Sequence, residues 1–205
     1  CAEGCPFSFD NGILYKGTEI AYVCPSAIAG TLVIPEGIET LSATFQGCTG
    51  ITDIQFPASL KTIAANAFMG CTGIESLHIP GTVKVIGNGA FQRCTSLKTL
   101  VMDDLADTEG VSYGYGIFNE CTSLNSVRLP QNMPAYNDMF VRCPSLSELV
   151  LPDAMGDIYY QAGPSVYSFS ICGMTRLDKL VLPRSVEKFP LDENHKVDSD
   201  MNQRV

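Results

Sequence analysis

Residues 68–80 read FMGCTGIESLHIP, and this stretch contains the features that decide the fold. It opens with Phe-x-x-Cys, continues with apolar residues at Ile74, Leu77 and Ile79, and ends in a proline. Similar copies recur every 22 to 29 residues, and self-similarity at such a period indicates a solenoid of stacked coils. The Phe-x-x-Cys pairs are Phe45/Cys48, Phe68/Cys71, Phe91/Cys94, Phe118/Cys121, Phe140/Cys143 and Phe169/Cys172.

The end of each copy predicts a short strand. In Leu77-His78-Ile79 apolar and polar residues alternate, which is the period of a strand with one buried face. The proline that follows lacks a backbone donor and keeps the preceding residue extended, so the strand ends there. Because each copy enters its strand from the same side, we expect a parallel sheet. Its seven short strands cover residues 32–34, 54–56, 77–79, 100–102, 127–129, 149–151 and 180–182.

The segments that connect the strands are too short for free helices, which are marginal below about 12–15 residues. They predict short helical or 3₁₀ turns opposite the sheet, linked as a right-handed coil. No copy buries its apolar face alone, so stability comes from stacking on its neighbours. We expect the six phenylalanines to stack as one internal column, with the six cysteines beside them as a ladder of buried thiols.

The strand phrase, its proline and the Ala-Phe-x-x-Cys turn, as at Ala67-Phe68 and Ala90-Phe91, resemble the leucine-rich repeats of the BspA type. The resemblance covers residues 11–190. Commoner leucine-rich repeats place Asn or Cys after the strand, whereas the cysteine here precedes it. The resemblance implies a leucine-rich-repeat solenoid at a bacterial cell surface, with adhesion or ligand binding as its role.

Three segments follow from where the repeat begins and ends. Residues 1–31 are expected to form an N-terminal cap, because Asp10-Asn11-Gly12 is a turn signal between apolar runs that suggest a hairpin. Residues 32–190 carry the repeats. Residues 191–205 lose the pattern and become polar, which indicates a C-terminal cap or tail.

Composition excludes several classes of partner. The formal charge is −9 and the pI is near 4.6, which argues against nucleic acid and against an anionic membrane surface. The sequence has no apolar stretch long enough to cross a bilayer. No cofactor is implied, and one cysteine per coil makes a linear column rather than a converging metal site.

The remaining cysteines, Cys1, Cys5 and Cys24, lie outside the ladder. A Cys5–Cys24 disulfide would staple the cap in an oxidising compartment. Disulfides between adjacent coils are an alternative to the thiol ladder where the Cα separation permits. Cys1 has two interpretations: the lipid anchor of an outer-membrane lipoprotein, which would be the chain's membrane contact, or an arbitrary boundary.

No catalytic set is evident, and we expect the chain not to be an enzyme. The histidines are His78, on a predicted strand, and His195, in the polar tail. Cys71 is near His78 in sequence but belongs to the ladder, where a buried thiol is inert. The acidic cluster at Asp103 and Asp104 has two interpretations: a solvated loop, or a calcium site that lacks the spacing of a calcium loop.

The surfaces are better functional candidates. The central residue of each strand should point outward, and valine at several of these positions suits protein recognition, although β-branched residues also favour strands in general. Tyrosines in the longer repeats suit either a recognition patch or loop anchoring. The candidate partner-binding residues are Gln55, His78, Val101, Arg128, Val150, Val181, Tyr113, Tyr115, Tyr159 and Tyr160, with Val33 in the same row.

The sequence therefore predicts a non-catalytic binding or adhesion module, extracellular or at the cell surface. Its partners would be proteins or glycans of a host or neighbouring cell, bound through the strand face and loops. The alternative is an architectural spacer or assembly unit of a larger surface protein.

Overall fold

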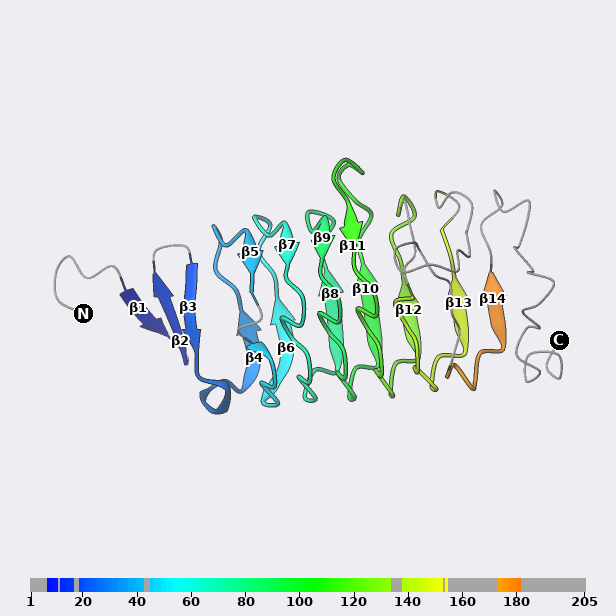
Figure 1. Cartoon of the computed structure of the whole chain (residues 1–205), viewed down its shortest axis with the longest axis horizontal. Coiled ribbons are helices and arrows are strands. Elements are labelled where there is room, and N and C mark those ends of the chain that lie inside the picture. Colours follow the sequence, from blue (N-terminus) through cyan, green and yellow to red (C-terminus); the bar gives the residue numbers. More distant parts are fainter. Residues whose placement is uncertain are drawn as a thin grey trace.

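The computed structural model describes residues 7–10, 12–16, 19–42, 45–133, 138–152, 154 and 173–181. Over these residues the chain is an elongated stack of coils that runs from the N-terminal strands to the later repeats (Figure 1). The predicted leucine-rich-repeat solenoid with its parallel strands is confirmed, and the strand bounds shift by a few residues. The main row of strands is β4 (Gly30–Val33), β6 (Ile51–Gln55), β8 (Ser76–Ile79), β10 (Thr99–Met102), β12 (Ser126–Arg128), β13 (Glu148–Val150) and β14 (Lys179–Val181).

Paired strands of this row are parallel and in register, so equivalent residues line up across the coils. In the β8–β10–β12 sheet, Val101 lies opposite both His78 and Arg128. β4 pairs with β6, and β13 pairs with β14. Alternating burial, as in β8 where Leu77 and Ile79 are buried and His78 is exposed, sends every second side chain outward. We call the outward surface of this row the strand face.

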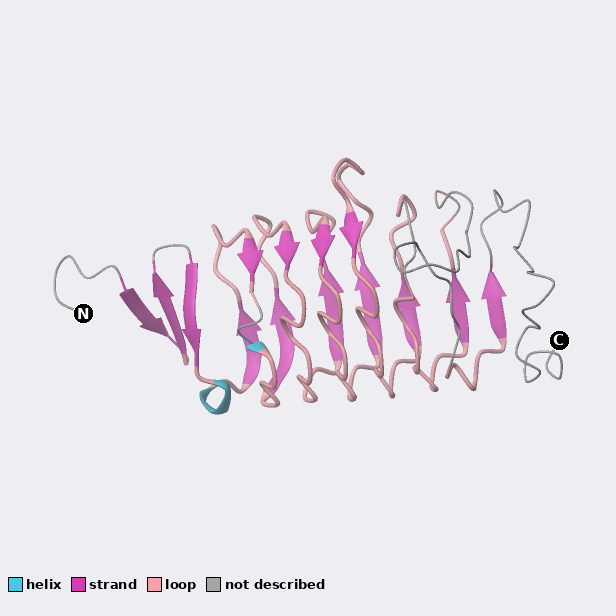
Figure 2. Cartoon of the chain, viewed as in Figure 1, coloured by secondary structure: helices cyan, strands magenta, loops and turns pink. Residues whose placement is uncertain are grey.

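A second, shorter parallel sheet lies in the half-repeats, where the sequence interpretation expected only turns. Its strands are β5 (Thr40–Leu41), β7 (Thr62–Ile63), β9 (Val85–Ile86) and β11 (Ser112–Tyr113), joined in that order. Each brings one buried residue to the core. The rest of the described half-repeats consists of hydrogen-bonded turns with almost no helix (Figure 2). An example is the turn in which Cys71 N–H donates to the Phe68 carbonyl at 3.2 Å.

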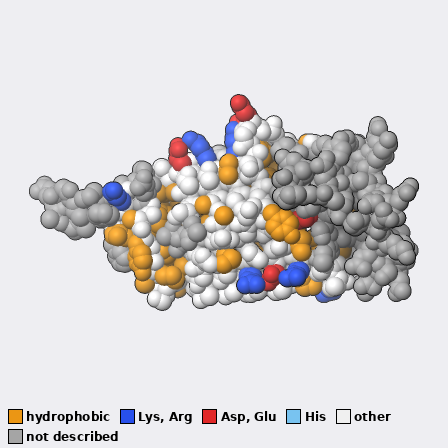
Figure 3. Space-filling model, in the orientation of Figure 1, with side chains coloured by type: hydrophobic (Ala, Val, Ile, Leu, Met, Phe, Trp, Pro, Cys, Tyr) orange, Lys and Arg blue, Asp and Glu red, His pale blue; other side chains and the backbone are white. Residues whose placement is uncertain are grey.

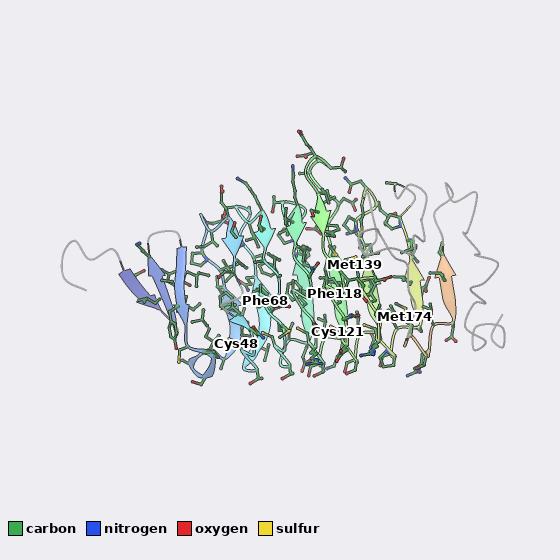
Figure 4. The ribbon with its side chains drawn as sticks, in the orientation of Figure 1. Cys48, Phe68, Phe118, Cys121, Met139 and Met174 are labelled. Atoms are coloured by element: carbon green, nitrogen blue, oxygen red, sulfur yellow. The ribbon has the colours of Figure 1, made fainter. Side chains whose placement is uncertain are left out.

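The phenylalanines of Phe-x-x-Cys form a stacked column inside the solenoid. Phe45, Phe68, Phe91, Phe118 and Phe140 are fully buried, and successive ring centroids are 5.1, 5.2, 5.5 and 5.5 Å apart with nearly parallel planes. Figure 4 shows Phe68 and Phe118 inside the stack, with Cys48 and Cys121 nearer to its lower edge. Phe169 lies outside the described residues. The distance between successive rings gives the rise from one coil to the next.

The repeat cysteines form a second column of thiols rather than disulfides. Cys48, Cys71, Cys94, Cys121 and Cys143 are free and buried. From the second copy on, each thiol donates to the phenylalanine carbonyl of the preceding coil. The Cys71 Sγ to Phe45 O distance is 3.1 Å, and the Cys94 Sγ to Phe68 O distance is 3.4 Å. Cys172 lies outside the described residues.

The N-terminal segment is a three-stranded antiparallel sheet of β1 (Phe7–Asp10), β2 (Ile13–Lys16) and β3 (Glu19–Val23), followed by the 3₁₀ helix η1 (Pro25–Ala27). Ile13, Tyr15 and Val23 join the core of the first coils. Of the two cysteines in the disulfide that the sequence suggested, Cys5 lies outside the described residues, and Cys24 is a free thiol whose Sγ lies 3.7 Å from Ser26 Oγ. Cys1 and Cys5 lie outside the described residues, as do residues 182–205.

Candidate functional site

The strand face presents one central side chain from each coil. Val33 and Val150 are 57 % and 42 % exposed, Gln55 and His78 are exposed, and Val101 is half-buried between its neighbours. The same row continues with Arg128, which is exposed, and Val181, which is half-buried. Since neighbouring strands are about 4.8 Å apart, the row is a regularly spaced surface on which apolar and polar side chains are mixed.

The two basic members of this row are paired to acidic residues after β10. His78 Nε2 lies 2.9 Å from Asp103 Oδ2. Arg128 donates from Nη1 to the Met102 carbonyl at 2.9 Å, and its Nη2 lies 3.4 Å from Asp104 Oδ1. The charged centre of the strand face is therefore held in a fixed arrangement by the neighbouring coils.

In the acidic loop after β10, the carboxylates of Asp103, Asp104 and Asp107 make contacts within the protein. Besides these two pairs, Asp107 accepts a hydrogen bond from Lys84 Nζ, and this bond lowers the pKa of Asp107. Asp104 Oδ1 also accepts the Gln131 N–H at 2.9 Å. Among the described residues, no group of three His, Cys, Asp or Glu side chains is placed to hold a metal ion.

The tyrosines of the longer repeats separate into different environments. Tyr115 is 48 % exposed, whereas Tyr113 is only 8 % exposed. Tyr113 lies on β11 opposite Ile86 of β9, and both side chains are buried in the core. The interpretation of Tyr113 as a surface recognition residue is therefore wrong. Burial raises the pKa of Tyr113 to about 12. Tyr159 and Tyr160 lie outside the described residues.

The repeat thiols are poor nucleophiles in this environment. Burial, with a smaller contribution from Cys48, raises the pKa of Cys71 from 9.0 to about 12. Burial also raises the pKa of Cys48 to about 11, and that of Cys143 further still. The thiolate is the reactive form of cysteine, so these side chains have a structural role in the column.

A third surface, which the sequence interpretation missed, lies along the turns that contain the repeat cysteines. The residue two places after each core phenylalanine has a left-handed backbone conformation in every described copy. The first two copies have glycine there, Gly47 and Gly70, with φ of 74° and 75°. The next three have Arg93, Glu120 and Arg142, with φ of 62°, 61° and 60°.

Glycine adopts this conformation without steric cost, whereas a residue with a side chain destabilises the folded state by about 1–2 kcal/mol when it adopts it. The three charged side chains form a network across successive coils. Arg93 Nε donates to Glu120 Oε2 at 2.9 Å, and Arg142 Nη1 lies 3.6 Å from Glu120 Oε1. The hydrogen bond from Arg93 is the main cause of a lowered pKa of Glu120. Exposed ion pairs contribute about 0–1 kcal/mol each, which does not offset the strain at three positions.

A shallow open groove of about 640 Å³ follows the same turns. We call it the turn-edge groove. Figure 3 shows basic, acidic and basic side chains in a row along the lower edge of the molecule, where these turns lie. The groove is lined by Arg93, Glu120, Arg142, Thr72, Thr95 and Thr122, among others. The sequence signal that could have found it is the position before the cysteine, where Gly47 and Gly70 mark a left-handed site.

The repeats establish the class and the family. The fold is a leucine-rich-repeat solenoid. A family model described as the BspA type leucine rich repeat region matches residues 39–172 in six copies. No curated protein matches the sequence. The chain therefore belongs to the BspA-type leucine-rich-repeat family.

Solved structures of bacterial leucine-rich repeat proteins share the fold. The T. pallidum leucine-rich repeat protein is 23 % identical with a TM-score of 0.59, over 75 % of this chain and 70 % of that one. A protein from Bacteroides ovatus is 25 % identical with a TM-score of 0.50, over 88 % of this chain and 52 % of that one. One from Eubacterium ventriosum is 20 % identical with a TM-score of 0.55, over 73 % and 47 %. The chain thus spans about half the length of the last two proteins.

Proposed function

We propose that this chain is a non-catalytic binding module that recognises a protein ligand through its strand face. The observation that carries the proposal is the row of outward side chains. Val33 and Val150 offer exposed apolar area, and the His78–Asp103 and Arg128–Asp104 pairs offer polar groups between them. Interfaces combine apolar contact with hydrogen-bonding groups in this way.

The fixed arrangement of the strand face supports the same proposal. Side chains that are ordered before binding lose less conformational entropy when the complex forms. His78 and Arg128 are each held by an acidic residue of a neighbouring coil. The strands that carry them are locked into one register by backbone pairing. A partner would therefore meet a rigid surface.

A binding screen with matched variants tests the proposal. Immobilised extracellular-matrix proteins and mucins would be the ligands. The strand-face variant Val33→Lys/Val150→Lys is matched by Gln46→Lys/Thr49→Lys, which changes exposed residues on the turns of the repeat cysteines. We expect saturable binding that the strand-face variant weakens at least about tenfold, since charged side chains replace apolar contacts, and that the control variant leaves unchanged.

Two results would contradict the proposal. Equal loss of binding in both variants would mean that charge alone, rather than the strand face, decides binding. No saturable binding to any protein would favour the architectural alternative, in which the solenoid is a spacer within a larger surface protein.

The proposed location is the outside of a bacterial cell, where proteins of the BspA type are typically found. Within the described residues, no helix has the length and apolar character needed to cross a membrane. Brief protease treatment of intact cells tests the location, with a cytoplasmic protein as the control. Digestion of this chain while the control survives is the expected result, and survival of both would contradict a surface location.

A further inference from the structure

The turn-edge groove carries a surplus of positive charge on an acidic chain. Elsewhere, Lys61, Lys84, Lys98 and Lys179 each pair with an acidic residue of their own. In the groove, Arg93 and Arg142 share the single carboxylate of Glu120. A guanidinium has five N–H donors, and Glu120 is the partner of both arginines among the described residues. Among the described residues, the groove therefore has guanidinium N–H donors available to a ligand and one net positive charge. The formal charge of the whole chain is −9.

Backbone strain indicates that these side chains serve a purpose beyond stability. Gly47 and Gly70 show that glycine satisfies the same position of the repeat. Arg93, Glu120 and Arg142 occupy it in three successive coils at a conformational cost. Strained residues that persist in a fold concentrate at ligand-binding positions. The arginines are also well exposed, so their guanidinium groups are accessible to a ligand.

The spacing of the groove favours one kind of ligand. Thr72, Thr95 and Thr122 lie one per coil along the groove, and the phenylalanine column gives a rise per coil of 5.1 to 5.5 Å. An extended peptide places side chains on one face about every 6.7 Å, so it drifts out of step with the coils. One pyranose residue of an extended polysaccharide is close to one coil in length, so successive sugar rings stay in step with the coils.

We propose that the turn-edge groove binds a polysaccharide of uronic acids. Carboxylates of the sugar chain pair with Arg93 and Arg142, and the sugar rings lie over Thr72, Thr95 and Thr122, which line the groove. The choice of carboxylate follows from Glu120, whose own carboxylate already lies between the two arginines. Glu120 therefore acts as an internal competitor that limits the affinity. This site is separate from the strand face and does not depend on the protein-binding role.

Calorimetric titration of the full chain with oligomers of β-1,4-linked mannuronic acid tests the site. The matched control is the neutral β-1,4-linked mannose oligomer of equal length. We expect saturable binding of the acidic oligomer, weakened by salt, and at least tenfold weaker binding of the neutral one. In Arg93→Gly/Arg142→Gly the affinity should fall at least tenfold while the melting temperature stays the same or rises. Glu120→Gly should bind several-fold more tightly, because the competitor is removed.

Four results would overturn the proposal. The first is no saturable binding of the acidic oligomer to the unaltered chain. The second is unchanged affinity in the double arginine variant with its melting temperature maintained. The third is equal binding of polyglutamate, which would assign the groove to acidic peptides. The fourth is weaker binding in Glu120→Gly, which would make Glu120 a contact for the ligand rather than its competitor.

Discussion

At the scale of single residues, one carbonyl group explains the spacing of Phe-x-x-Cys. The Phe68 carbonyl accepts the N–H of Cys71 in its own turn at 3.2 Å and the thiol of Cys94 in the next coil at 3.4 Å. A carbonyl oxygen has two lone pairs, so both bonds are satisfied at once. The cysteine thus closes the turn with its backbone and joins two coils with its side chain.

The ring column makes the first stability prediction. Phe91 stacks between Phe68 and Phe118 at 5.2 and 5.5 Å and is fully buried. Phe91→Ala should lower the free energy of unfolding by about 3–5 kcal/mol, because it removes apolar area and leaves a cavity. Urea unfolding measures the change. Phe91→Leu is the control and should cost less than half as much, and equal costs would argue against a packed column.

Two substitutions at the left-handed positions should change the stability of the fold in different directions. Gly70→Ala should cost about 1–2 kcal/mol, since the new Cβ makes only an ordinary contact with Gly47 Cα at 4.0 Å and the penalty is conformational. Arg93→Gly at the equivalent position should leave stability unchanged or raise it. Thermal unfolding of both variants checks the pair. A clear loss of stability in Arg93→Gly would show that the ion pairs outweigh the strain.

The buried thiols predict how stability depends on alkaline pH. The unfolded chain releases the Cys71 proton near pH 9.0, while the folded chain retains it up to about pH 12. Stability from this group is complete below the lower value and is lost as pH rises through the window between them. Tyr113, whose pKa is raised to about 12, acts with the same sign.

Denaturant unfolding at pH 7, 9, 10 and 11 measures this effect. We expect the free energy of unfolding to fall above pH 9, and to fall less steeply in Cys71→Val, which has no proton to lose. Identical pH dependence in the two proteins would mean that the Cys71 thiol is not protected from ionisation in the folded state.

At the scale of elements, the strands of the main row could be predicted from the sequence and those of the second sheet could not. Leu77-His78-Ile79-Pro80 shows both the alternation and the stop of a strand. Thr62–Ile63 is a strand of two residues, and two residues carry no measurable period. Tyr113 was misjudged for the same reason, because only the register with Ile86 places it in the core.

The turn-edge groove was missed for a different physical reason. In a sequence, a left-handed position is usually recognised because it holds glycine. Arg93, Glu120 and Arg142 are not glycines, so their left-handed conformation could not be recognised from residue type. These three residues occupy the same position of the repeat as Gly47 and Gly70, and the structure shows one backbone conformation at all five positions. The ion pairs depend on side chains from different coils, which no local pattern predicts.

The repeat as an element predicts tolerance to deletion in units of one coil. Removing residues 69–91 joins Phe68 to Gln92 and restores Phe-x-x-Cys with Cys94. Because each coil contacts only its neighbours, we expect a folded, shorter solenoid with a lower melting temperature. Circular dichroism and thermal unfolding measure both properties.

The control removes residues 69–79 only, which deletes β8 and shifts the remaining coil out of register. This variant should lose its cooperative unfolding transition. The modular account would be wrong if the 23-residue deletion were unfolded, or if the shorter deletion were equally stable.

At the scale of the whole molecule, charge pairing between coils shapes what the surface offers. Lys61–Glu39, Lys98–Glu75 and Lys179–Glu148 join adjacent coils with distances of 2.6 to 2.9 Å. Exposed pairs of this kind add little stability each, but they place a carboxylate beside each of these three lysines. The strand face offers apolar side chains together with paired polar groups, and in the turn-edge groove Arg93, Glu120 and Arg142 leave one net positive charge.

Site-specific photo-crosslinking tests the central claim, that the strand face receives the protein ligand, most directly. A photoreactive amino acid would replace Val150 on the strand face or, as the control, Gln46 on the turns of the repeat cysteines. Irradiation with the ligand from the binding screen should then give a crosslinked product from position 150 and none from position 46. Crosslinking from position 46 alone would contradict the account and move the binding surface to the other side of the coils.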